Sequence, residues 1–284
     1  MKLEFICEND NIRLTEELKL HVSRRLYKNI KSNDIIVYVN GTPKERFKEI
    51  MRGDVISLEY DVAHEIKWDI YLSKLDVRYE DEDYLIVYKR GGLQSIPTKG
   101  SPYSLYQEAL YYLKENNEDL SVSILNRLDR DTKGLVVIAK NRFACYKLSP
   151  THEKMTRKYI ALCEGIFKDN EGIIDTFINK EEESNKRFVS LNSGKRAITH
   201  YHVLKNINGN SLVEFVLDTG RTHQIRVHSL YLGHPIIGDS MYGSGDGDLK
   251  LFSYYVRFYH YRLNKEIEIK INEDEDVVLL DGEE

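Results

Sequence analysis

Short runs of apolar, β-branched and aromatic residues, separated by polar turns, recur along most of the chain. Runs of this kind predict strands, here at residues 84–89, 136–140, 158–163, 197–204, 212–217 and 266–271. Apolar residues at helical spacing predict helices at residues 104–116 and 222–232. Because the strands outnumber the helices and do not alternate regularly with them, the pattern favours an α+β domain with a mainly antiparallel sheet.

Residues 12–60 follow a different pattern, which indicates a separate small unit at the start of the chain. Thr15 is a candidate N-cap for a helix. The basic residues Arg24, Lys28 and Lys31 fall at helical spacing on one face of the next segment, with Arg25 beside Arg24. This pattern alone fits either an RNA-binding surface or an amphipathic helix with a solvated basic face.

The second half of this unit predicts a short ribbon of strands. Asn40-Gly41 is a strong hairpin signal after the apolar run at residues 35–39, and a further strand is predicted at residues 53–58. Residues 61–76 are expected to be a linker to the larger domain.

Composition limits the class of protein. The chain has 284 residues, of which 41% are hydrophobic and 31% charged, and no apolar run approaches the length of a membrane span. The first residues include acids where a secretory signal would need an apolar block, so we expect a cytoplasmic protein. Cys7, Cys145 and Cys163 are far apart and lack metal-ligand spacing, which predicts neither disulfides nor a metal site.

The charge is unevenly distributed. Residues 272–284 contain seven acids and no base, so without this acidic tail the net charge of −5 becomes +2. Between residues 126 and 158 there are nine Lys and Arg residues and three acids. Such a local excess is compatible with a bound polyanion, although a solvated helix face would look similar.

A dense charge cluster lies just before a strand that is expected to be buried. Residues 126–134 read Asn-Arg-Leu-Asp-Arg-Asp-Thr-Lys-Gly and precede the apolar run at residues 135–139. Charges at such a position are costly to desolvate unless paired, so the cluster indicates either a structural ion-pair network or a reactive site. These two interpretations are about equally plausible from the residues alone.

A second dense motif spans residues 217–243. Thr222 is a candidate cap for a helix that follows Gly220, and Arg221 at the start of that helix suits an anionic partner. Three histidines in this region raise the possibility of a metal, but His223 and His228 lie five residues apart and lack the spacing of a helical metal site.

These motifs together resemble the RluA/RluD family of pseudouridine synthases, whose two hallmarks read HRLDRDTSG and GRTHQIRVHxxxLGHPIxGDxxYG. They correspond to residues 126–134 and 220–243, and three further blocks at residues 79–93, 156–165 and 195–204 follow in the same order. Residues 12–60 resemble the alpha-L RNA-binding motif of a ribosomal small-subunit protein, with the usual pattern SRRxxxKxIKS, VxVNG and GDxI.

The resemblance implies an alpha-L type RNA-binding domain at residues 1–62 and a pseudouridine synthase domain at residues 76–271 with a mixed, mainly antiparallel sheet. It implies an isomerase that converts uridines of RNA to pseudouridine, either in large-subunit ribosomal RNA or in transfer RNA. The reaction oxidises nothing and no group leaves the enzyme, so no cofactor is expected, and we expect a monomer with neither metal nor membrane as a partner.

The resemblance also implies roles for individual residues. Asp129 corresponds to the essential aspartate, Tyr159 to the active-site tyrosine and Arg221 to the arginine that holds the aspartate ionised. Arg127 corresponds to the arginine that occupies the space left by a flipped nucleotide. The remaining expected substrate-binding residues are Ile225 and Arg226 in the second motif, and Arg24, Arg25 and Lys28 in the alpha-L segment.

Two other classes of protein stay open. A catalytically silent RNA-binding or ribosome-assembly factor could retain the same fold, and a glycoside hydrolase would need a second carboxylate such as Asp131. We interpret Asp131 as structural and paired with Arg130. Asn126, Lys133 and Arg90 depart from the family pattern, and the two added positive charges could contact phosphates or simply be solvated.

Overall fold

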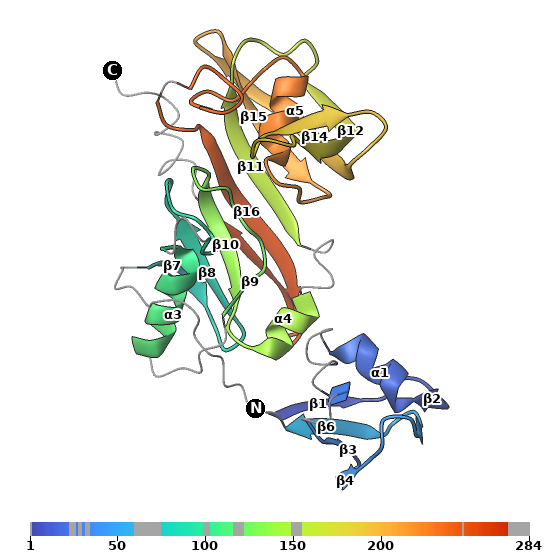
Figure 1. Cartoon of the computed structure of the whole chain (residues 1–284). Coiled ribbons are helices and arrows are strands. Elements are labelled where there is room, and N and C mark those ends of the chain that lie inside the picture. The colour runs from blue at the N-terminus through green and yellow to red at the C-terminus, as the bar shows by residue number, and fades with distance from the viewer. Residues whose placement is uncertain are drawn as a thin grey trace. The chain divides into compact units, whose positions relative to one another are not determined.

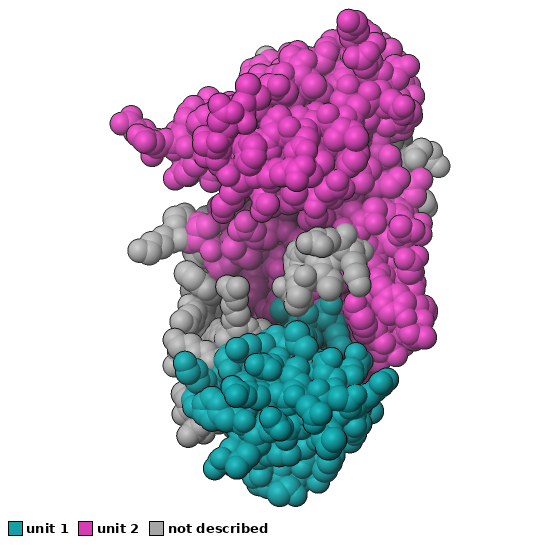
Figure 2. Space-filling view, turned by 90° about the vertical axis from the view of Figure 1, so that its right-hand side faces the viewer, with its two compact units in different colours: residues 1–67, 142–147 teal, residues 68–141, 148–284 magenta. Residues whose placement is uncertain are grey.

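The computed structural model describes residues 2–22, 27, 30–31, 35–59, 75–98, 103–115, 122–148, 155–245 and 247–271. It divides into two compact units, which are coloured separately in Figure 2. The first comprises residues 1–67 with 142–147, and the second comprises residues 68–141 with 148–284. Within the described residues, no helix is both long enough and apolar enough to cross a lipid bilayer.

The first unit contains a four-stranded antiparallel sheet with the strand order β1-β6-β3-β4 (Figure 1). Its strands are β1 (Lys2–Ile6), β3 (Val37–Val39), β4 (Thr42–Pro43) and β6 (Val55–Glu59), and β2 (Ile12–Arg13) pairs with β5 (Glu49–Ile50). The predicted hairpin is confirmed, because Asn40 and Gly41 connect β3 to β4 with φ of 50° and 76°. Positive φ at both central residues is the requirement of a type I′ turn.

Helix α1 (Leu14–His21) covers the core of this unit, where Leu14 and Leu18 pack with Ile50, Ile56 and Leu58. The prediction that Thr15 caps this helix is wrong. The helix begins one residue earlier, and the N–H groups of Leu14 and Thr15 donate to carbonyl oxygens of the neighbouring chain segment at 3.0 and 2.9 Å. Backbone acceptors therefore satisfy the free donors that a cap side chain would otherwise bind.

The second unit contains an 11-stranded mixed sheet, which confirms the predicted fold class. Nine strands follow the order β13-β12-β14-β15-β11-β16-β10-β8-β7, while β17 pairs with β16 and β9 with β10. The strands are β7 (Asp76–Glu80), β8 (Tyr84–Lys89), β9 (Ser123–Ile124), β10 (Lys133–Ala139), β11 (Thr156–Cys163), β12 (Glu171–Lys180), β13 (Arg187–Ser190), β14 (Lys195–Ile207), β15 (Asn210–Leu217), β16 (Leu251–His260) and β17 (Lys265–Lys270).

Alternate residues of neighbouring strands build the core along one face of this sheet. Val136 on β10, Ala161 on β11 and Phe215 on β15 belong to a single cluster of buried apolar side chains. Helix α3 (Leu105–Glu115) adds Leu105 and Leu110 to that cluster, which confirms the predicted helix at residues 104–116. Helix α5 (Gln224–Tyr231) also lies in this unit, whereas α4 (Arg142–Leu148) falls almost entirely in the first unit.

Nearly all strand pairs are antiparallel, but β10 and β16 run parallel at the middle of the sheet. Gly134 pairs there with Ser253 and has a φ of 117°. A Cβ atom at position 134 would lie 2.2 Å from the Ser253 carbonyl oxygen, so only glycine allows the two backbones to approach this closely. This junction fixes the point at which the charged loop of residues 126–132 enters the sheet.

Candidate active site

The loop of residues 126–132 is anchored at both of its ends. The buried Asn126 side chain accepts the Val137 N–H at 2.7 Å and donates to the Leu135 carbonyl at 3.2 Å. The Ser95 hydroxyl accepts the Leu128 N–H at 3.0 Å and donates to the Leu128 carbonyl at 2.8 Å. Asn126 is one of the departures from the family pattern. Its side chain therefore serves as the hydrogen-bond partner of backbone groups of β10.

Lys89, at the end of β8, holds the middle of the same loop. Its ammonium is fully buried and donates to the carbonyl oxygens of Leu93, Arg130 and Arg90 at 2.7, 2.9 and 3.0 Å. Burial lowers the pKa of Lys89 to about 7, against the attraction of the nearby Asp131 and Asp129. Three acceptor oxygens match the three donors of an ammonium, so we assign the charged form to Lys89 in the folded protein.

Asp129 is presented by this loop beside a buried arginine of helix α5. Its side chain is 27% exposed, and its Oδ2 lies 3.8 Å from Nη1 of Arg226, whose side chain is 6% exposed. Asp239 holds Arg226 in place through two parallel hydrogen bonds, from Nε at 2.7 Å and from Nη2 at 2.6 Å. This bidentate pair leaves Nη1 directed at Asp129.

Asp239 is itself well stabilised as an anion. Its Oδ1 also accepts the N–H groups of Met241 and Tyr242 at 2.9 and 3.0 Å. Burial is the largest single influence and raises the pKa of this carboxyl, but the hydrogen bonds and charge of Arg226 together with the two N–H groups lower the pKa of Asp239 below its ordinary value. The charges of the carboxylate and the guanidinium are therefore fixed before any ligand binds.

The structure corrects the expected pairing of Arg221 with Asp129. The Nε of Arg221 donates to the Arg196 carbonyl at 2.8 Å, and its side chain is exposed. Among the described residues, the arginine within ion-pair distance of Asp129 is Arg226. The physical reason is that Arg221 precedes α5, whereas Arg226 lies in the first turn of the helix and faces inward.

The start of α5 differs from the prediction in another respect, because Thr222 does not cap it. The helix begins at Gln224, and the cap position is occupied by His223 in the left-handed conformation, with φ of 57°. The Gln224 side chain accepts the Arg221 N–H at 2.9 Å and donates to the Ile198 carbonyl at 2.9 Å. Gln224 thus reaches back over the turn that precedes the helix and fixes that turn, and no side chain caps the helix itself.

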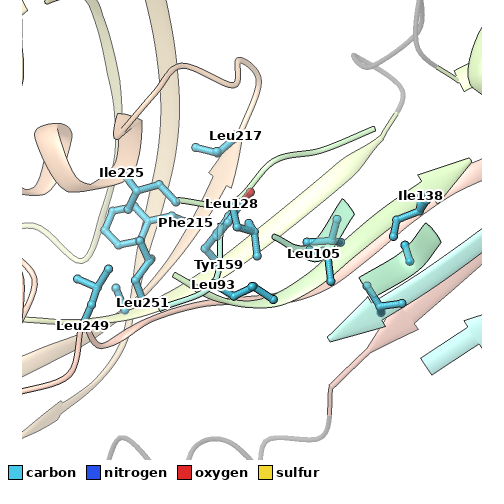
Figure 3. Close-up of a cluster of buried hydrophobic side chains, with 14 of the residues drawn as sticks. Leu93, Leu105, Leu128, Ile138, Tyr159, Phe215, Leu217, Ile225, Leu249 and Leu251 are labelled. Atoms are coloured by element: carbon cyan, nitrogen blue, oxygen red, sulfur yellow. The ribbon is translucent and has the colours of Figure 1, made fainter. Parts of the chain in front are cut away.

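Tyr159 lies on β11 within the apolar wall of the site. Figure 3 shows its side chain among Leu128, Phe215 and Ile225, and all of these residues belong to the main core cluster. Burial raises the pKa of the Tyr159 hydroxyl, as does the nearby Asp129, so the phenol is protonated at neutral pH. The expected site residues Asp129, Tyr159, Ile225 and Arg226 are therefore brought together, whereas Arg221 is not.

Three other basic residues in or near the loop have local partners. The guanidinium of Arg130 donates to Asp131 at 3.0 and 3.2 Å, which confirms the interpretation of this carboxylate as paired. Lys133 donates to Asp248 at 3.2 Å, and Arg90 donates to Glu108 at 2.7 Å. The added positive charges at positions 133 and 90 are thus engaged with acids within the protein.

The remaining expected residues differ in how far the structure describes them. Arg127 is exposed and makes no hydrogen bond or ion pair with a described residue. Arg24, Arg25 and Lys28 lie outside the described residues, as does the acidic tail at residues 272–284. Within the described part of the chain, no group of three or more His, Cys, Asp or Glu side chains is arranged to hold a metal ion.

Sequence reasoning missed Lys89, Ser95 and Asp239, which position the loop and the arginine. The signal for Lys89 was a single lysine at the end of an otherwise apolar strand, where a charge needs buried acceptors. Asp239 lies within the second motif, but nothing in its spacing from Arg226 indicates that the two would pair.

His228, on the buried face of α5, provides a test of how the helix is held. Its Nδ1 lies 2.8 Å from the Thr199 hydroxyl and its Nε2 lies 3.1 Å from the Thr176 hydroxyl. Thr199 also accepts a hydrogen bond from Gln224 at 2.9 Å, so its own proton is directed to Nδ1 of His228. The network therefore selects the neutral imidazole with its proton on Nε2.

Burial lowers the pKa of His228 from 6.5 to about 4. Because the pKa of His228 is depressed in the folded state, the stability that the neutral imidazole contributes is fully present above pH 6.5. This stability is lost as the pH falls toward 4, by about 3 kcal/mol. We expect urea midpoints of the wild type to fall more steeply with decreasing pH than those of His228→Asn. His202→Asn, at an exposed histidine, is the control, and equal slopes for wild type and His228→Asn would contradict the prediction.

The geometry can be compared with known proteins. The sequence profile of the family described as RNA pseudouridylate synthase matches residues 83–231, which include the loop, β11 and α5. The chain belongs to the RluA/RluD-type RNA pseudouridine synthases. It is therefore an isomerase that modifies RNA by converting uridine to pseudouridine.

Curated relatives support this assignment over most of the chain. The uncharacterized RNA pseudouridine synthase YlyB of Bacillus subtilis is 34% identical over 213 residues, covering 73% of this chain and 70% of that protein. The ribosomal large subunit pseudouridine synthase D of Borreliella burgdorferi is 31% identical over 279 residues, covering 91% of this chain and 84% of that protein.

Solved structures support the fold of the synthase. Human RNA pseudouridylate synthase domain containing 1 superposes with a TM-score of 0.59 at 24% sequence identity, covering 70% of this chain and 83% of that one. Human RNA pseudouridylate synthase domain containing 4 gives the same TM-score of 0.59 at 19% identity. At these identities the likeness concerns the fold alone.

Proposed function

We propose that this synthase modifies specific uridines of large-subunit ribosomal RNA, with transfer RNA as the alternative substrate, and that Asp129 carries the chemistry. The observation that supports this most directly is the placement of the accessible Asp129 carboxylate 3.8 Å from a guanidinium that is itself fixed by Asp239. The names of relatives such as ribosomal large subunit pseudouridine synthase D support ribosomal RNA as the substrate class.

The reaction requires the bond from ribose C1′ to the uracil N1 to break, the uracil to rotate, and a new bond to form from C1′ to C5. An ionised Asp129 can attack C1′ as a nucleophile, or it can remove a ribose proton to give a glycal intermediate. Arg226 places a fixed positive charge beside the carboxylate in either route. The proton that leaves C5 after the new bond forms must be removed, and this step allows the reaction to be followed with tritium.

The target nucleotide must leave its stack to reach Asp129, at a cost of a few kcal/mol. The apolar wall around Tyr159 offers a flat face for the displaced uracil, and its protonated hydroxyl can take part in a proton transfer. Arg127, which is exposed and makes no hydrogen bond or ion pair with a described residue, is suited to occupy the space that the nucleotide leaves. Contacts with the RNA backbone would offset part of the flipping cost.

We assign RNA binding to the first unit as part of the same proposal. Its confirmed hairpin at Asn40-Gly41 and the following strand β6 agree with the second half of the alpha-L pattern. The basic residues Arg24, Arg25 and Lys28 would contact phosphates. Removal of residues 1–62 should weaken RNA binding more than it changes the rate at saturating RNA, if this unit mainly contributes affinity.

The test is to incubate the purified full chain with ribosomal and transfer RNA transcribed in vitro with 5-tritiated uridine. Release of tritium from the large-subunit RNA, and loss of pseudouridine at a defined position in a deletion strain, are the expected results. Absence of release from either RNA, together with an unchanged pseudouridine map in the deletion strain, would favour a catalytically silent RNA-binding factor.

A further inference from the structure

Arg157 is a buried cation without a partner among the residues that the structure describes. Its side chain is 8% exposed, its Nε has no hydrogen-bond partner, and its guanidinium makes no ion pair or hydrogen bond with a described residue. The other buried Lys and Arg residues of the described chain are engaged: Arg226 with Asp239, Lys140 with Glu80, and Lys89 with its carbonyl oxygens. Arg157 is therefore the exception within the described part of the protein.

An unpaired buried guanidinium is energetically unfavourable. Removing such a charge from water costs several kcal/mol unless an anion and hydrogen-bond acceptors replace the water. Buried polar groups that lack a partner in an otherwise well-satisfied structure call for a ligand or another specific explanation. The charge of arginine cannot be relieved by deprotonation, so Arg157 calls for an anionic partner that the described residues do not supply.

Arg157 belongs to the active-site side of the sheet. It lies two residues before Tyr159 on β11, so the two side chains emerge on the same face of the strand. Both Arg157 and Asp129 influence the Tyr159 hydroxyl electrostatically, which places the three side chains in one neighbourhood. Tyr159 thus has Asp129 and Arg157 as charged neighbours. Asp129 has Arg226 as its cationic partner, whereas Arg157 has no anionic partner among the described residues.

The tip of Arg157 also reaches the surface of the site. A Cβ atom at position 220 would lie 3.0 Å from Nη1 of Arg157, so the absence of a side chain at Gly220 leaves room for the guanidinium. Gly220 is exposed, and the chain continues from it into α5. A ligand at this turn can therefore approach the terminal nitrogens while Nε stays buried.

We propose that Arg157 is a phosphate-binding residue of the active site, which pairs with a backbone phosphate next to the flipped uridine. The inference rests on the proposed function, because it takes RNA as the ligand. A nucleotide that swings out of its stack carries its adjoining phosphates toward the pocket wall. A guanidinium fork matches phosphate oxygens in charge and geometry, and pairing there would satisfy the donors that the free protein leaves open.

The principal experiment measures RNA affinity as a function of KCl concentration for the wild type, Arg157→Met and Arg157→Lys. The probe is in vitro transcribed large-subunit ribosomal RNA. Loss of one phosphate contact should flatten the slope of log K against log[KCl] by about 0.7 to 0.9 and weaken binding by roughly tenfold at low salt for Arg157→Met. Arg157→Lys keeps the charge and should retain most of the slope.

Arg257→Met is the matched control. Arg257 lies on β16, is half exposed and is within 3.8 Å of Glu266, so its removal should leave the slope unchanged. Arg157→Met should unfold at a urea concentration equal to or above that of the wild type, because an uncompensated buried charge is replaced by an apolar chain. A purely structural role for Arg157 would instead lower the urea midpoint and leave the salt slope unaltered.

A second arm measures ligand-induced stabilisation of the wild type and of Arg157→Met. Thermal unfolding is measured with uridine 5′-monophosphate, uridine 3′-monophosphate and uridine. A larger rise in Tm with either monophosphate than with uridine, abolished in Arg157→Met, supports the proposal. This measurement needs no turnover, so a wild type that binds the phosphate but releases no tritium would refute the proposed function and leave the phosphate site standing.

Two results would overturn the inference. In the first, the wild type is active, and Arg157→Met shows the same salt slope and the same nucleotide-induced Tm shifts as the wild type. In the second, the variant binds RNA with unchanged affinity and slope but reacts more slowly at saturating RNA. A slower rate with unchanged binding would mean that Arg157 stabilises charge that develops on the uracil in the transition state, and does not bind a phosphate.

Discussion

Asp129→Asn should reduce tritium release at saturating RNA by at least about a thousandfold, the largest loss that we expect from any single substitution. The amide has the shape of the carboxylate but can neither form a bond to C1′ nor remove a ribose proton. RNA affinity should stay close to that of the wild type, because the substitution removes no cation. The measurement is single-turnover release from 5-tritiated uridine RNA, with binding followed separately.

The folded state should tolerate this change. The Asp129 side chain is partly exposed and its contact with Arg226 spans 3.8 Å, so the free energy of unfolding should change by about 1 kcal/mol or less. Asp131→Asn is the matched control, because that carboxylate pairs with Arg130 at 3.0 Å and should be dispensable for turnover. Equal inactivity of the two variants would instead indicate a two-carboxylate mechanism, and an active Asp129→Asn would refute the assignment.

The fold could be predicted where a segment carries its own periodicity. Strand β8, helix α3 and the Asn40-Gly41 hairpin were predicted close to their observed positions because their apolar spacing or turn chemistry is local. The strands β12, β13 and β16 were not predicted. In β12 the apolar Ile173 is exposed and the polar Thr176 is buried, and the run of aromatic residues in β16 does not alternate, so neither gives a clear period of hydrophobicity.

The arrangement of the sheet could not be predicted from any single segment. The parallel pairing of β10 with β16 joins residues more than a hundred positions apart, and it depends on the backbone contact between Gly134 and Ser253. That contact places the charged loop at the middle of the sheet, opposite α5. A glycine at the end of a charged motif suggests a turn, but its partner strand is visible only in three dimensions.

The site shows the same limit at the level of side chains. The sequence indicated the correct loop and the correct second motif, yet the resemblance assigned the carboxylate partner to Arg221. Arg221 precedes α5, whereas Arg226 lies in its first turn and faces inward. Which of the two arginines contacts Asp129 depends on this three-dimensional placement and not on their order in the motif.

Arg226→Met is expected to have the second-largest effect, because it removes the common partner of two carboxylates. Asp129 loses its neighbouring cation, and we expect a loss of about a hundredfold to a thousandfold in the rate at saturating RNA. Asp239 is left fully buried with only two backbone N–H donors, which should cost about 3 to 5 kcal/mol of stability. Urea unfolding and single-turnover tritium release measure the two effects.

The two effects can be separated by a second substitution. Arg226→Met combined with Asp239→Asn neutralises the buried carboxylate while keeping an oxygen for the Met241 and Tyr242 N–H groups. We expect the double variant to regain much of the lost stability and none of the lost activity. Recovery of activity along with stability would mean that Arg226 serves the fold alone.

Arg221→Met provides the comparison that decides between the two arginines. Arg221 is exposed and its Nε binds only the Arg196 carbonyl, so its removal should change stability by less than about 1 kcal/mol and the rate at saturating RNA by less than about tenfold. If Arg221→Met were inactive and Arg226→Met active, the pairing in the free protein would not be the one that serves catalysis. The contrast thus tests whether the fixed Asp239–Arg226–Asp129 arrangement is the one in which the aspartate reacts.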